Sequence, residues 1–423
     1  MKKELILNLL NLSNNYNLIG IKEEEVRGKM GLVIDVDFNM KRIRRDVKCP
    51  VCGSCNISIH ERKKKKRLIL HLILPDGRRI YLRLPRIRFR CKECNKTFSY
   101  YPEGIHPWMR ISDNLLLTSI YNLRRGSFRE VSSFIGVHTR TLKRYIDRFM
   151  RNSIPWEYFD GMRDIRIGID EHSMRGKKIK VTLVVELNSH IPITILPSDR
   201  KEEIVRFFNS IPLHVKKRIK EVSIDMRESF RRGIRESLGS NVRIVVDPFH
   251  VIRDANRRID EERKLIQSTH LYYKGKRIKI PKILFLKGRE KLTDKEKNKL
   301  DYYFNLYPSL KEFYEVKERL RYMFNYMKHE DIEVIREYIN NLIRDMEVSD
   351  DPEIRRWSKT LKRWREEIIN HFFNFSSTSI VEGYNTLSKL IKRISFGLRD
   401  VNTYINKVFL GIVPIHLLPH LLT

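Results

Sequence analysis

The chain has 423 residues, and its 85 Lys and Arg residues against 52 Asp and Glu residues give a formal net charge of +33. Because a single hydrophobic core rarely grows beyond about 250–300 residues, we expect more than one domain. The charge favours a polyanionic partner, most often nucleic acid, over an anionic membrane surface, although a structural role in a basic, ribosome-like assembly would produce a similar excess.

The N-terminal segment, residues 1–45, begins with the pattern of a helix and continues into a short strand, GLVIDVDF. Its start, MKKELILNLLNLSNNYN, mimics a signal peptide, but asparagines interrupt the apolar run and no small-residue cleavage site follows. Near the other end, VFLGIVPIHLLPHLL is too short to span a bilayer and is broken by prolines. We therefore predict a soluble, intracellular protein with no membrane partner.

The five cysteines form two tight groups, which favours metal binding over disulfides. Four of them make two CxxC motifs roughly forty residues apart, with the spacing of a tetrahedral zinc site: Cys49, Cys52, Cys91 and Cys94. Between the motifs, two strand-like runs are joined by Pro-Asp-Gly, a hairpin signal. We therefore predict a zinc ribbon over residues 46–105 with one structural zinc ion, the alternative being four reduced structural cysteines. Cys55 is left over, and the run RKKKKR is either a solvated face or a phosphate contact.

Residues 106–152 contain SFREVSSFIGVHTRTLKRYIDRF, the pattern of a helix, a turn and a second helix. Ser127 and Glu130 have the spacing of a capping box at the start of the first helix. Gly136 supplies the turn, and Thr139 is expected to cap the second helix. The outward-facing cations of that second helix would lie where a DNA major groove fits: Arg140, Lys143 and Arg144. The alternative is an ordinary helical hairpin.

Residues 160–250 alternate strands with helices. In RDIRIGIDEHSMRGKKIKVTLVVEL, apolar and polar residues alternate as far as Asp170, where we expect the first strand to end. The adjacent Glu171 is expected to orient Asp170 or to pair with Arg175. A basic turn then leads into a second, β-branched strand, and HIPITILP is a third. The turn carries three cations placed to grip phosphate: Arg175, Lys177 and Lys178.

Four further segments complete this region: helix 202–213, strand 221–225, helix 227–238 and strand 241–247. The order of three strands, helix, strand, helix and strand is that of an α/β sheet of the ribonuclease H type. Asp170 and Asp225 would then end neighbouring strands at one edge, and Asp247 and His250 close the last strand nearby. A carboxylate at a strand end beside cations can hold a divalent metal against a phosphate.

Residues 251–372 are almost wholly helical in pattern and low in glycine, which predicts a large all-helical insertion. Trp357 and Trp364 lie on one face of a helix, where packing is favoured over stacking on an extruded base.

The last region, residues 373–423, contains STSIVEGYNTLSKLIKRISFGLRD. As a helix, this stretch places Glu382 and Asn385 on one side. The cations of the helix would contact DNA: Lys389, Lys392 and Arg393. A carboxylate near an amide and several cations suits a face that binds metal and phosphate.

Four stretches, IDEHS, SIDMRESF, VVDPFHVIRDANRRID and STSIVEGYNTLSKLIKRISFGLRD, follow the double CxxC ribbon in this order. In this they resemble the DDE transposases of bacterial and archaeal insertion sequences, specifically the ISL-three family, from about residue 49 onward. The resemblance implies an RNase H-like catalytic domain with a helical insertion, and three catalytic acids: Asp170, Asp225 and Glu382. Asp247 and His250 match an accessory D-x-x-H element, and Asn385 belongs to the intact Glu-Gly-x-Asn core. Upstream of that core, the chain has Thr-Ser-Ile where members often carry Thr-Asn-Gly.

The predicted fold is therefore multidomain α+β: a zinc ribbon, a helix-turn-helix, and an α/β RNase H-like domain with a large all-helical insertion. The three acids are suited to hold two Mg²⁺ or Mn²⁺ ions, and the resemblance implies hydrolysis that frees a 3′-hydroxyl, followed by attack of that hydroxyl on target DNA. Double-stranded DNA is the expected partner, and a homodimer or larger assembly in a prokaryotic cytoplasm, associated with the nucleoid, is expected on it. Two alternatives remain: a non-catalytic zinc-ribbon and helix-turn-helix regulator, and an RNase H-like nuclease without strand transfer.

Overall fold

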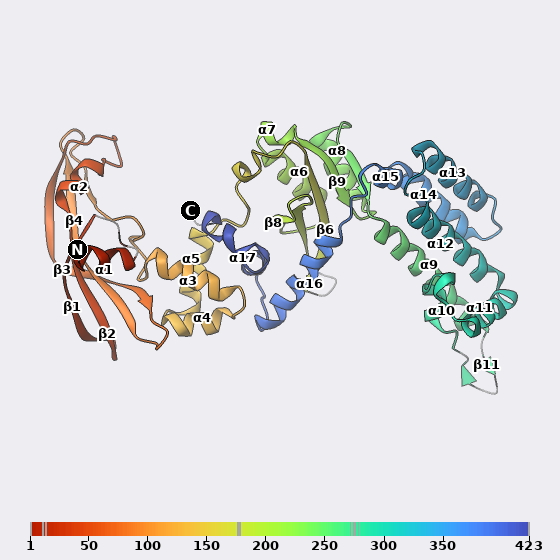
Figure 1. Ribbon diagram of the computed structural model, residues 1–423, viewed down its shortest axis with the longest axis horizontal. Coiled ribbons are helices and arrows are strands. Elements are labelled where there is room, and N and C mark those ends of the chain that lie inside the picture. The colour runs from red at the N-terminus through yellow and green to blue at the C-terminus, as the bar shows by residue number, and fades with distance from the viewer. Residues whose placement is uncertain are drawn as a thin grey trace.

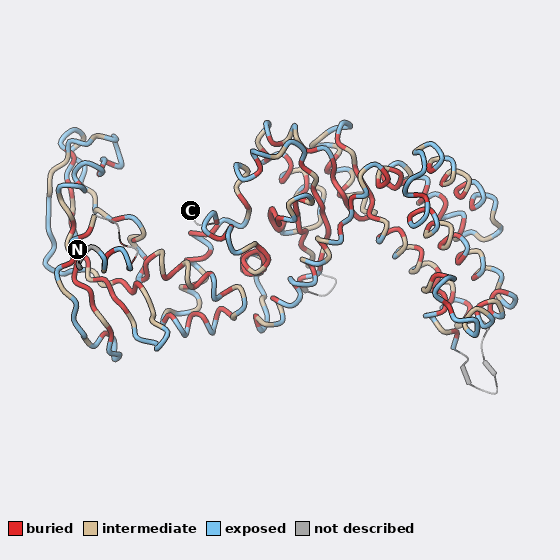
Figure 2. Tube along the Cα trace, in the orientation of Figure 1, coloured by how far each residue is buried: buried red, intermediate tan, exposed pale blue. Residues whose placement is uncertain are grey.

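The computed structural model describes residues 2–10, 12, 15–175, 179–270, 272–273, 276–277 and 279–421. The molecule is elongated: a β-sheet, a small group of helices, a second sheet and a bundle of helices follow one another along its length (Figure 1). Buried positions follow the strands of both sheets and the inward sides of the helices (Figure 2). The protein is therefore mixed α+β, as predicted.

The N-terminal sheet combines the first 45 residues with the two CxxC motifs. Its strands are ordered β1-β2-β4-β3, with β5 paired to β4, and β2 pairs with β4 in parallel. The boundary predicted at residue 45 therefore runs through a single sheet. The predicted strand GLVIDVDF lies within β2, but β1 has no predicted counterpart because its Lys-Glu-Glu-Glu run hides the apolar alternation. The elements are α1 (Lys2–Leu9), β1 (Tyr16–Val26), β2 (Lys29–Phe38), α2 (Met40–Asp46), β3 (Ile57–Ile73), β4 (Arg79–Cys91) and β5 (Thr97–Ser99).

Three helices follow the sheet: α3 (Asp113–Leu123), α4 (Phe128–Ile135) and α5 (Thr139–Phe149). The predicted capping box is confirmed, since Ser127 and Glu130 exchange both hydrogen bonds at the start of α4. Gly136 ends α4 in the left-handed conformation with φ of 69°. The predicted cap of α5 is wrong by one residue, because His138 accepts the hydrogen bond from the backbone of Arg140. Thr139 instead bonds the hydroxyl of Ser132 in α4.

The central sheet has the order β10-β9-β6-β7-β8, with β10, β9 and β6 parallel and β7 and β8 antiparallel. Each predicted strand and helix of this region is present. The predicted end of the first strand at Asp170 is wrong, because β6 continues through Arg175 by pairing with β7. The elements are η1 (Trp156–Phe159), β6 (Ile165–Arg175), β7 (Ile179–Glu186), β8 (Ile191–Leu196), α6 (Lys201–Ser210), α7 (Leu213–Lys216), β9 (Ile219–Ile224), α8 (Glu228–Leu238) and β10 (Arg243–Val246).

A long helix leaves the central sheet and begins the helical bundle at the far end of the molecule (Figure 1). Trp357 and Trp364 are both buried in this helical bundle, and Trp357 stacks on Phe313 at 6.1 Å between ring centroids. The packing interpretation of the two tryptophans is therefore confirmed. The elements are α9 (Pro248–His270), β11 (Tyr272–Tyr273), β12 (Lys276–Arg277), α10 (Lys282–Leu286), η2 (Arg289–Lys291), α11 (Asp294–Leu306), α12 (Pro308–Tyr326), α13 (Ile332–Glu347), α14 (Pro352–Ile369) and α15 (His371–Asn374).

The chain then returns to the central sheet as α16 (Ser379–Ile394), which packs on β6 and β7. Gly168 of β6 permits this close approach. A Cβ atom at Gly168 would lie 2.8 Å from Val381 Cγ2 and 2.6 Å from Leu187 Cδ2. The glycine therefore sets how near the start of α16 lies to the sheet.

The next helix, α17 (Val401–Ile412), connects the central sheet to α3 and α5, before η3 (Ile415–Leu421) ends the described chain. Buried Lys407 donates to the backbone carbonyl of Leu123, and Asn406 Nδ2 donates to Asp147 Oδ1 at 2.8 Å. These polar contacts lie within apolar packing. Through them α17 connects the group formed by α3, α4 and α5 to the central sheet.

We expect Gly168→Ala to lower the free energy of unfolding by about 1–3 kcal/mol, because the added methyl group would overlap Leu187 and Val381. Urea denaturation of the purified chain measures the change. Gly383→Ala is the matched control, since no atom lies within 4 Å of its Cβ position and alanine favours a helix by about 0.5–1 kcal/mol. Equal effects of the two substitutions would contradict the close approach.

Candidate functional site

Two aspartates on neighbouring parallel strands form the centre of the candidate site. β6 and β9 pair with Gly168 opposite Ser223. Asp170 and Asp225 each lie two residues beyond that pair, and side chains two residues apart share one face of a strand. Because neighbouring strands lie about 4.8 Å apart, the two carboxylates are held side by side.

Both carboxylates are buried, and that of Asp225 is incompletely hydrogen-bonded. Burial, reinforced by the charge of Asp225, raises the pKa of Asp170 from 3.8 to about 7. Burial also raises the pKa of Asp225, whose Oδ1 has no hydrogen-bond partner. Buried carboxylates destabilise one another unless a proton or a cation neutralises them. The pair therefore offers free oxygen ligands of the kind that Mg²⁺ and Mn²⁺ prefer.

Glu382 is the third acid of the site and lies in the first turn of α16. Its charge contributes to the raised pKa of Asp170, so the two carboxylates are close enough to interact electrostatically. Burial and then the charge of Asp247 raise the pKa of Glu382 itself. Within the described residues, the three carboxylates do not form a closed group at metal-ligand distance. Asp170 thus interacts electrostatically with both of the other predicted acids.

Asn385, one turn after Glu382, orients the first acid. Its Nδ2 donates to Asp170 Oδ2 at 2.8 Å, and the backbone N–H of Glu171 donates to Asp170 Oδ1 at 2.9 Å. Each carboxylate oxygen therefore has one donor and keeps a lone pair for a cation. His172 lies two residues further along β6, and its burial lowers its pKa to about 4. The imidazole is neutral at pH 7 and contacts the Tyr404 hydroxyl at 2.7 Å.

Asp247 lies beside the site with both carboxylate oxygens occupied. Its Oδ1 accepts from the backbone N–H of Phe249 at 2.7 Å. Its Oδ2 accepts from Ser377 Oγ at 3.0 Å, from Thr378 Oγ1 at 2.9 Å and from the Thr378 backbone N–H. His250 is buried, with Nε2 3.5 Å from Thr378 Oγ1. The predicted accessory residues therefore connect the start of α9 to the turn before α16.

Arg253 is a residue of the site that the sequence interpretation missed. It is exposed on α9, one turn after Phe249, with its guanidinium 5.8 Å from the centre of that ring. Its charge opposes the rise in the pKa of Asp170, Asp225 and Glu382. It forms no ion pair within the described part of the chain, and it lines a cavity of about 610 Å³ with Asp225 and His250. The only signal in the sequence was its spacing from the Asp-x-x-His motif.

Glu171 belongs to a separate group of ion pairs beside the acids. Its Oε1 accepts from Lys180 Nζ at 2.7 Å, and it also pairs with Arg227. Arg227 pairs in turn with Asp199, and its Nε lies 3.7 Å from Asp225 Oδ2. The backbone of Glu171 does orient Asp170, as described above. The predicted pair with Arg175 involves a side chain outside the described residues.

The four predicted zinc ligands lie together at one end of β3 and β4. The sulfur atoms of Cys49, Cys52, Cys91 and Cys94 all lie within 4.8 Å of one another. The separations are 3.6 Å for Cys49 and Cys94 and 3.5 Å for Cys52 and Cys91, close to the roughly 3.8 Å expected around tetrahedral zinc. The backbone N–H of Cys52 lowers the pKa of Cys49 to about 7, and that of Cys94 lowers the pKa of Cys91. The group could bind zinc, and Cys55 stays exposed outside it.

The predicted DNA-contacting cations of α5 and α16 lie near the surface. Arg140 and Arg144 are exposed, and half-buried Lys143 lies over the Phe128 ring at 5.4 Å. On α16, Lys389 and Arg393 are exposed and Lys392 is half-buried. Lys177 and Lys178 lie outside the described residues.

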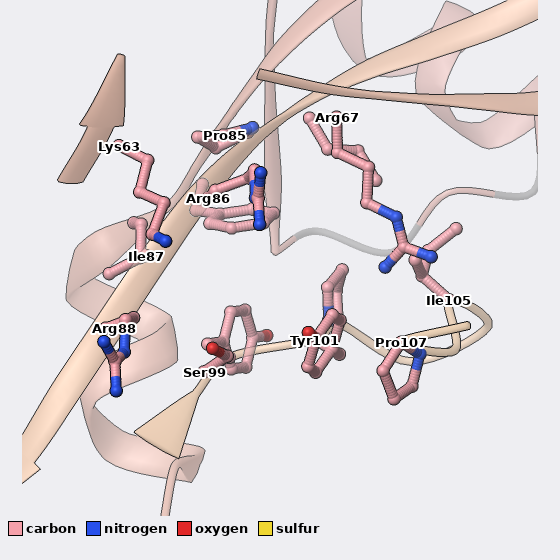
Figure 3. A pocket seen from close by; sticks show the side chains of 14 residues that line it. Lys63, Arg67, Pro85, Arg86, Ile87, Arg88, Ser99, Tyr101, Ile105 and Pro107 are labelled. Carbon is pink, nitrogen blue, oxygen red and sulfur yellow. The ribbon is translucent and has the colours of Figure 1, made fainter. Parts of the chain in front are cut away.

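A second basic surface lies on the N-terminal sheet, around a cavity of about 390 Å³ (Figure 3). Four cations line it: Lys63, Arg67, Arg86 and Arg88. Lys63 of β3 lies directly opposite Arg86 of β4, a pairing of like charges that a bound anion would relieve. Arg67 lies over the Tyr101 ring at 5.5 Å. The run RKKKKR indicated part of this surface, while the cations of β4 were missed because they are scattered along an apolar strand.

No helix in the described part of the chain is long and apolar enough to cross a membrane.

Comparison with known proteins agrees with the resemblance seen in the motifs. A model of the ISL-three DDE transposases, described as a transposase, matches residues 167–408. The chain is 24% identical over 366 residues to the transposase for insertion sequence element IS1001 of Bordetella parapertussis, which covers 85% of this chain and 87% of that protein. It is 24% identical over 306 residues to the transposase for insertion sequence element IS1557 of Mycobacterium tuberculosis, covering 67% and 65% respectively.

We expect Cys91→Ser to lower the zinc content from about one ion per chain towards zero and to destabilise the N-terminal sheet, because a tetrahedral site loses one of four thiolates. Elemental analysis and thermal denaturation measure the two effects. Cys55→Ser makes the same change outside the group and should alter neither. Native protein without zinc, or equal losses in both variants, would count against the site.

Asp170→Asn is expected to stabilise the chain by about 1–2 kcal/mol, which raises the melting temperature by roughly 1–2 °C, at pH 8 in magnesium-free buffer, and by much less at pH 5. The pKa of Asp170 is about 7 in the folded chain and about 3.9 when unfolded, so folding binds a proton between these values and stability falls as pH rises. Above pH 7 the folded chain must bury the charge that asparagine lacks. Thermal denaturation at both pH values measures the difference, with exposed Asp164→Asn as the control. A gain independent of pH would refute this explanation.

Proposed function

Because the chain belongs to the ISL-three family of DDE transposases, we propose that it binds the ends of an insertion sequence and uses Asp170, Asp225 and Glu382 to cleave and transfer DNA strands. Transposition is the function of the family. The observation that carries the assignment of the acids is their position: two lie at equivalent places on adjacent parallel strands, and the third acts electrostatically on the first.

We propose that the central sheet is an RNase H-like catalytic core. Its order places three antiparallel strands, β8, β7 and β6, beside two parallel ones, β9 and β10, as that fold requires. On this proposal, residues 160–250 and 373–423 form the core and residues 251–372 an insertion. Residues 46–105 form the zinc ribbon and 106–152 the helix-turn-helix, with 1–45 as a separate N-terminal segment by sequence.

The reaction has two steps that use the same acids. In the first, water attacks the phosphorus at the element end, the bond from phosphorus to the 3′ oxygen breaks, and the strand is left with a 3′-hydroxyl. In the second, that hydroxyl attacks a phosphodiester of target DNA, so one bond replaces another without a covalent protein intermediate. Two Mg²⁺ or Mn²⁺ ions, when bound, would activate the attacking oxygen and stabilise the leaving one.

The chain's own residues have distinct roles in this proposal. Asp170, Asp225 and Glu382 would hold the metals, and Asn385 fixes the carboxylate of Asp170 by its hydrogen bond. Three carboxylates would leave two divalent ions with net positive charge, which suits the binding of phosphate. Arg253, which forms no ion pair with any described residue, is placed to contact the same phosphate. Asp247 and His250 maintain the shape of the site.

DNA binding follows from the family, and we propose the surfaces that provide it. The cations of α5 are suited to a major groove, and those of α16 and of the turn at 175–178 to the strand at the acids. The basic cavity of the N-terminal sheet adds a phosphate-binding surface (Figure 3). We expect a homodimer or a larger assembly on DNA, since two ends must be brought together, and association with the nucleoid.

Two other functions make different predictions. A non-catalytic regulator would have no use for buried, incompletely bonded acids, which are costly to maintain. A nuclease of the same fold would cut DNA without joining it. The raised pKa of Asp170 and the orphan oxygen of Asp225 favour a metal-dependent reaction over the first of these.

Replacing Asp170, Asp225 or Glu382 by Ala is expected to slow magnesium-dependent cleavage of the DNA ends by at least about 10³-fold, equivalent to about 4 kcal/mol of lost transition-state stabilisation. The dissociation constant for the same DNA should stay within about threefold, because the cations that bind it are unchanged. Gel-based cleavage and fluorescence anisotropy measure the two quantities.

Asp164→Ala removes an exposed acid just before β6 and is the matched control, expected to cleave normally. Full activity of Asp225→Ala would transfer the second metal-binding role to Asp247. A joining assay with a second duplex then separates the alternatives: a transposase cuts and joins, a nuclease only cuts, and a regulator does neither.

A further inference from the structure

The turn that follows α16 carries the most exposed large apolar side chain of the described chain. Phe396 is 89% exposed, and its backbone has φ of +52°. This left-handed conformation is unfavourable for a bulky aromatic residue, whereas Gly397 adopts it freely at +93°. The turn therefore maintains a strained backbone that presents a phenyl ring to solvent.

Another phenylalanine with a positive φ does have aromatic neighbours. Phe375 also has a positive φ, of 50°, but its ring packs against those of His371 and Phe372, with centroids 5.7 and 6.4 Å away. Phe396 has no aromatic neighbour within the described residues, and its exposure leaves little surface for packing. The contact that would compensate its conformation is therefore expected from another molecule.

The ring lies at the edge of a cavity of about 820 Å³ between the catalytic helix and the helix-turn-helix. One side is formed by residues 395–398, and the other by the start of α4 and by Lys143 of α5. In Figure 1 the lower end of α16 approaches α4 across this space. Any ligand bound along α5 would thus reach the turn after α16.

The charges around the turn identify the class of ligand. Arg129 and Lys143 line the cavity, and Lys392, Arg393 and Arg399 lie within four residues of Phe396 in the sequence. None of these five cations forms an ion pair in the part of the chain that the structure describes. The nearby acids are already used, since Glu130 closes the capping box of α4 and Asp400 caps α17. An exposed aromatic ring among free cations suits a polyanion with planar apolar groups, which is the chemistry of nucleic acid.

We propose that Phe396 inserts into the base stack of bound DNA and opens one base step. The inference rests on the proposed function, because it requires DNA to pass from α5 to the acids. Apolar side chains that enter a base step unstack and kink the duplex. Phe396 follows Glu382 by about 20 Å at 1.5 Å per residue. For a duplex that runs parallel to α16, at 3.4 Å per base pair, the opened step lies about six base pairs from the cleaved phosphate.

The test uses the full chain and end-DNA duplexes in which 2-aminopurine, a base whose fluorescence rises on unstacking, replaces one base at a time. Without magnesium no strand is cut, so binding alone is observed. We expect a severalfold rise at one position about six base pairs from the cleaved phosphate. Phe396→Ala should abolish this rise, change the dissociation constant by less than about threefold and leave the melting temperature nearly unchanged. Phe396→Trp should preserve it.

Phe134→Ala is the matched control, because Phe134 is 48% exposed on α4 but does not line the cavity. It should leave the fluorescence rise intact. An unchanged rise in Phe396→Ala, or no rise at any position with native protein fully bound, would overturn the insertion. Bound native protein that unstacks the base but never cleaves DNA in magnesium would instead refute the proposed function and leave the insertion standing.

Discussion

The geometry of the candidate site depends on one buried carboxylate, that of Asp247. It binds the backbone of Phe249 at the start of α9 and the side chains of Ser377 and Thr378 just before α16, segments 130 residues apart in sequence. The point where the chain leaves the central sheet is thereby joined to the point where it returns. The position of Arg253 depends on the first segment, at the start of α9, and the position of Glu382 depends on the second, just before α16. The helical bundle between them can then vary in length at little cost, because the entropic cost of bringing the two ends of a segment together grows only slowly with its number of residues.

Burial of the acids is the main electrostatic cost of this arrangement, repulsion between them adds to it, and surrounding cations limit it. Arg253 opposes the rise in the pKa of all three acids, and Lys180 and Arg227 also oppose the rise in the pKa of Asp225. Burial still dominates, so the pKa of Asp170 reaches about 7. The protein alone does not neutralise its own site. That imbalance favours a proton at the site at low pH, and on the proposed function a metal cation would compete for the site at higher pH.

Features set by local sequence were predictable, and features set by tertiary contacts were not. The alternating isoleucines before Asp170 indicated a strand, and the short CxxC spacing indicated two pairs of metal-binding thiolates, because both patterns involve neighbouring residues. The tertiary fold then brings the two pairs together. The predicted end of β6 was wrong because pairing with β7, and not the sequence of β6 alone, decides how far the strand continues. The role of Arg253 and the bonds of Asp247 arise between segments distant in sequence, and no periodicity records them. Phe396 was overlooked because only the folded chain shows that its ring has nothing to pack against.

The helix α17 has a consequence for where DNA would be cut. It packs on α3 and α5 on one side and on α16 and the central sheet on the other, with Lys407 and Asn406 bonding the first group directly. Because α17 contacts both groups, the proposed function predicts that a sequence read by α5 would lie at a set separation from the acids. The number of base pairs between that sequence and the cleaved bond would then depend on the thickness of one buried helix.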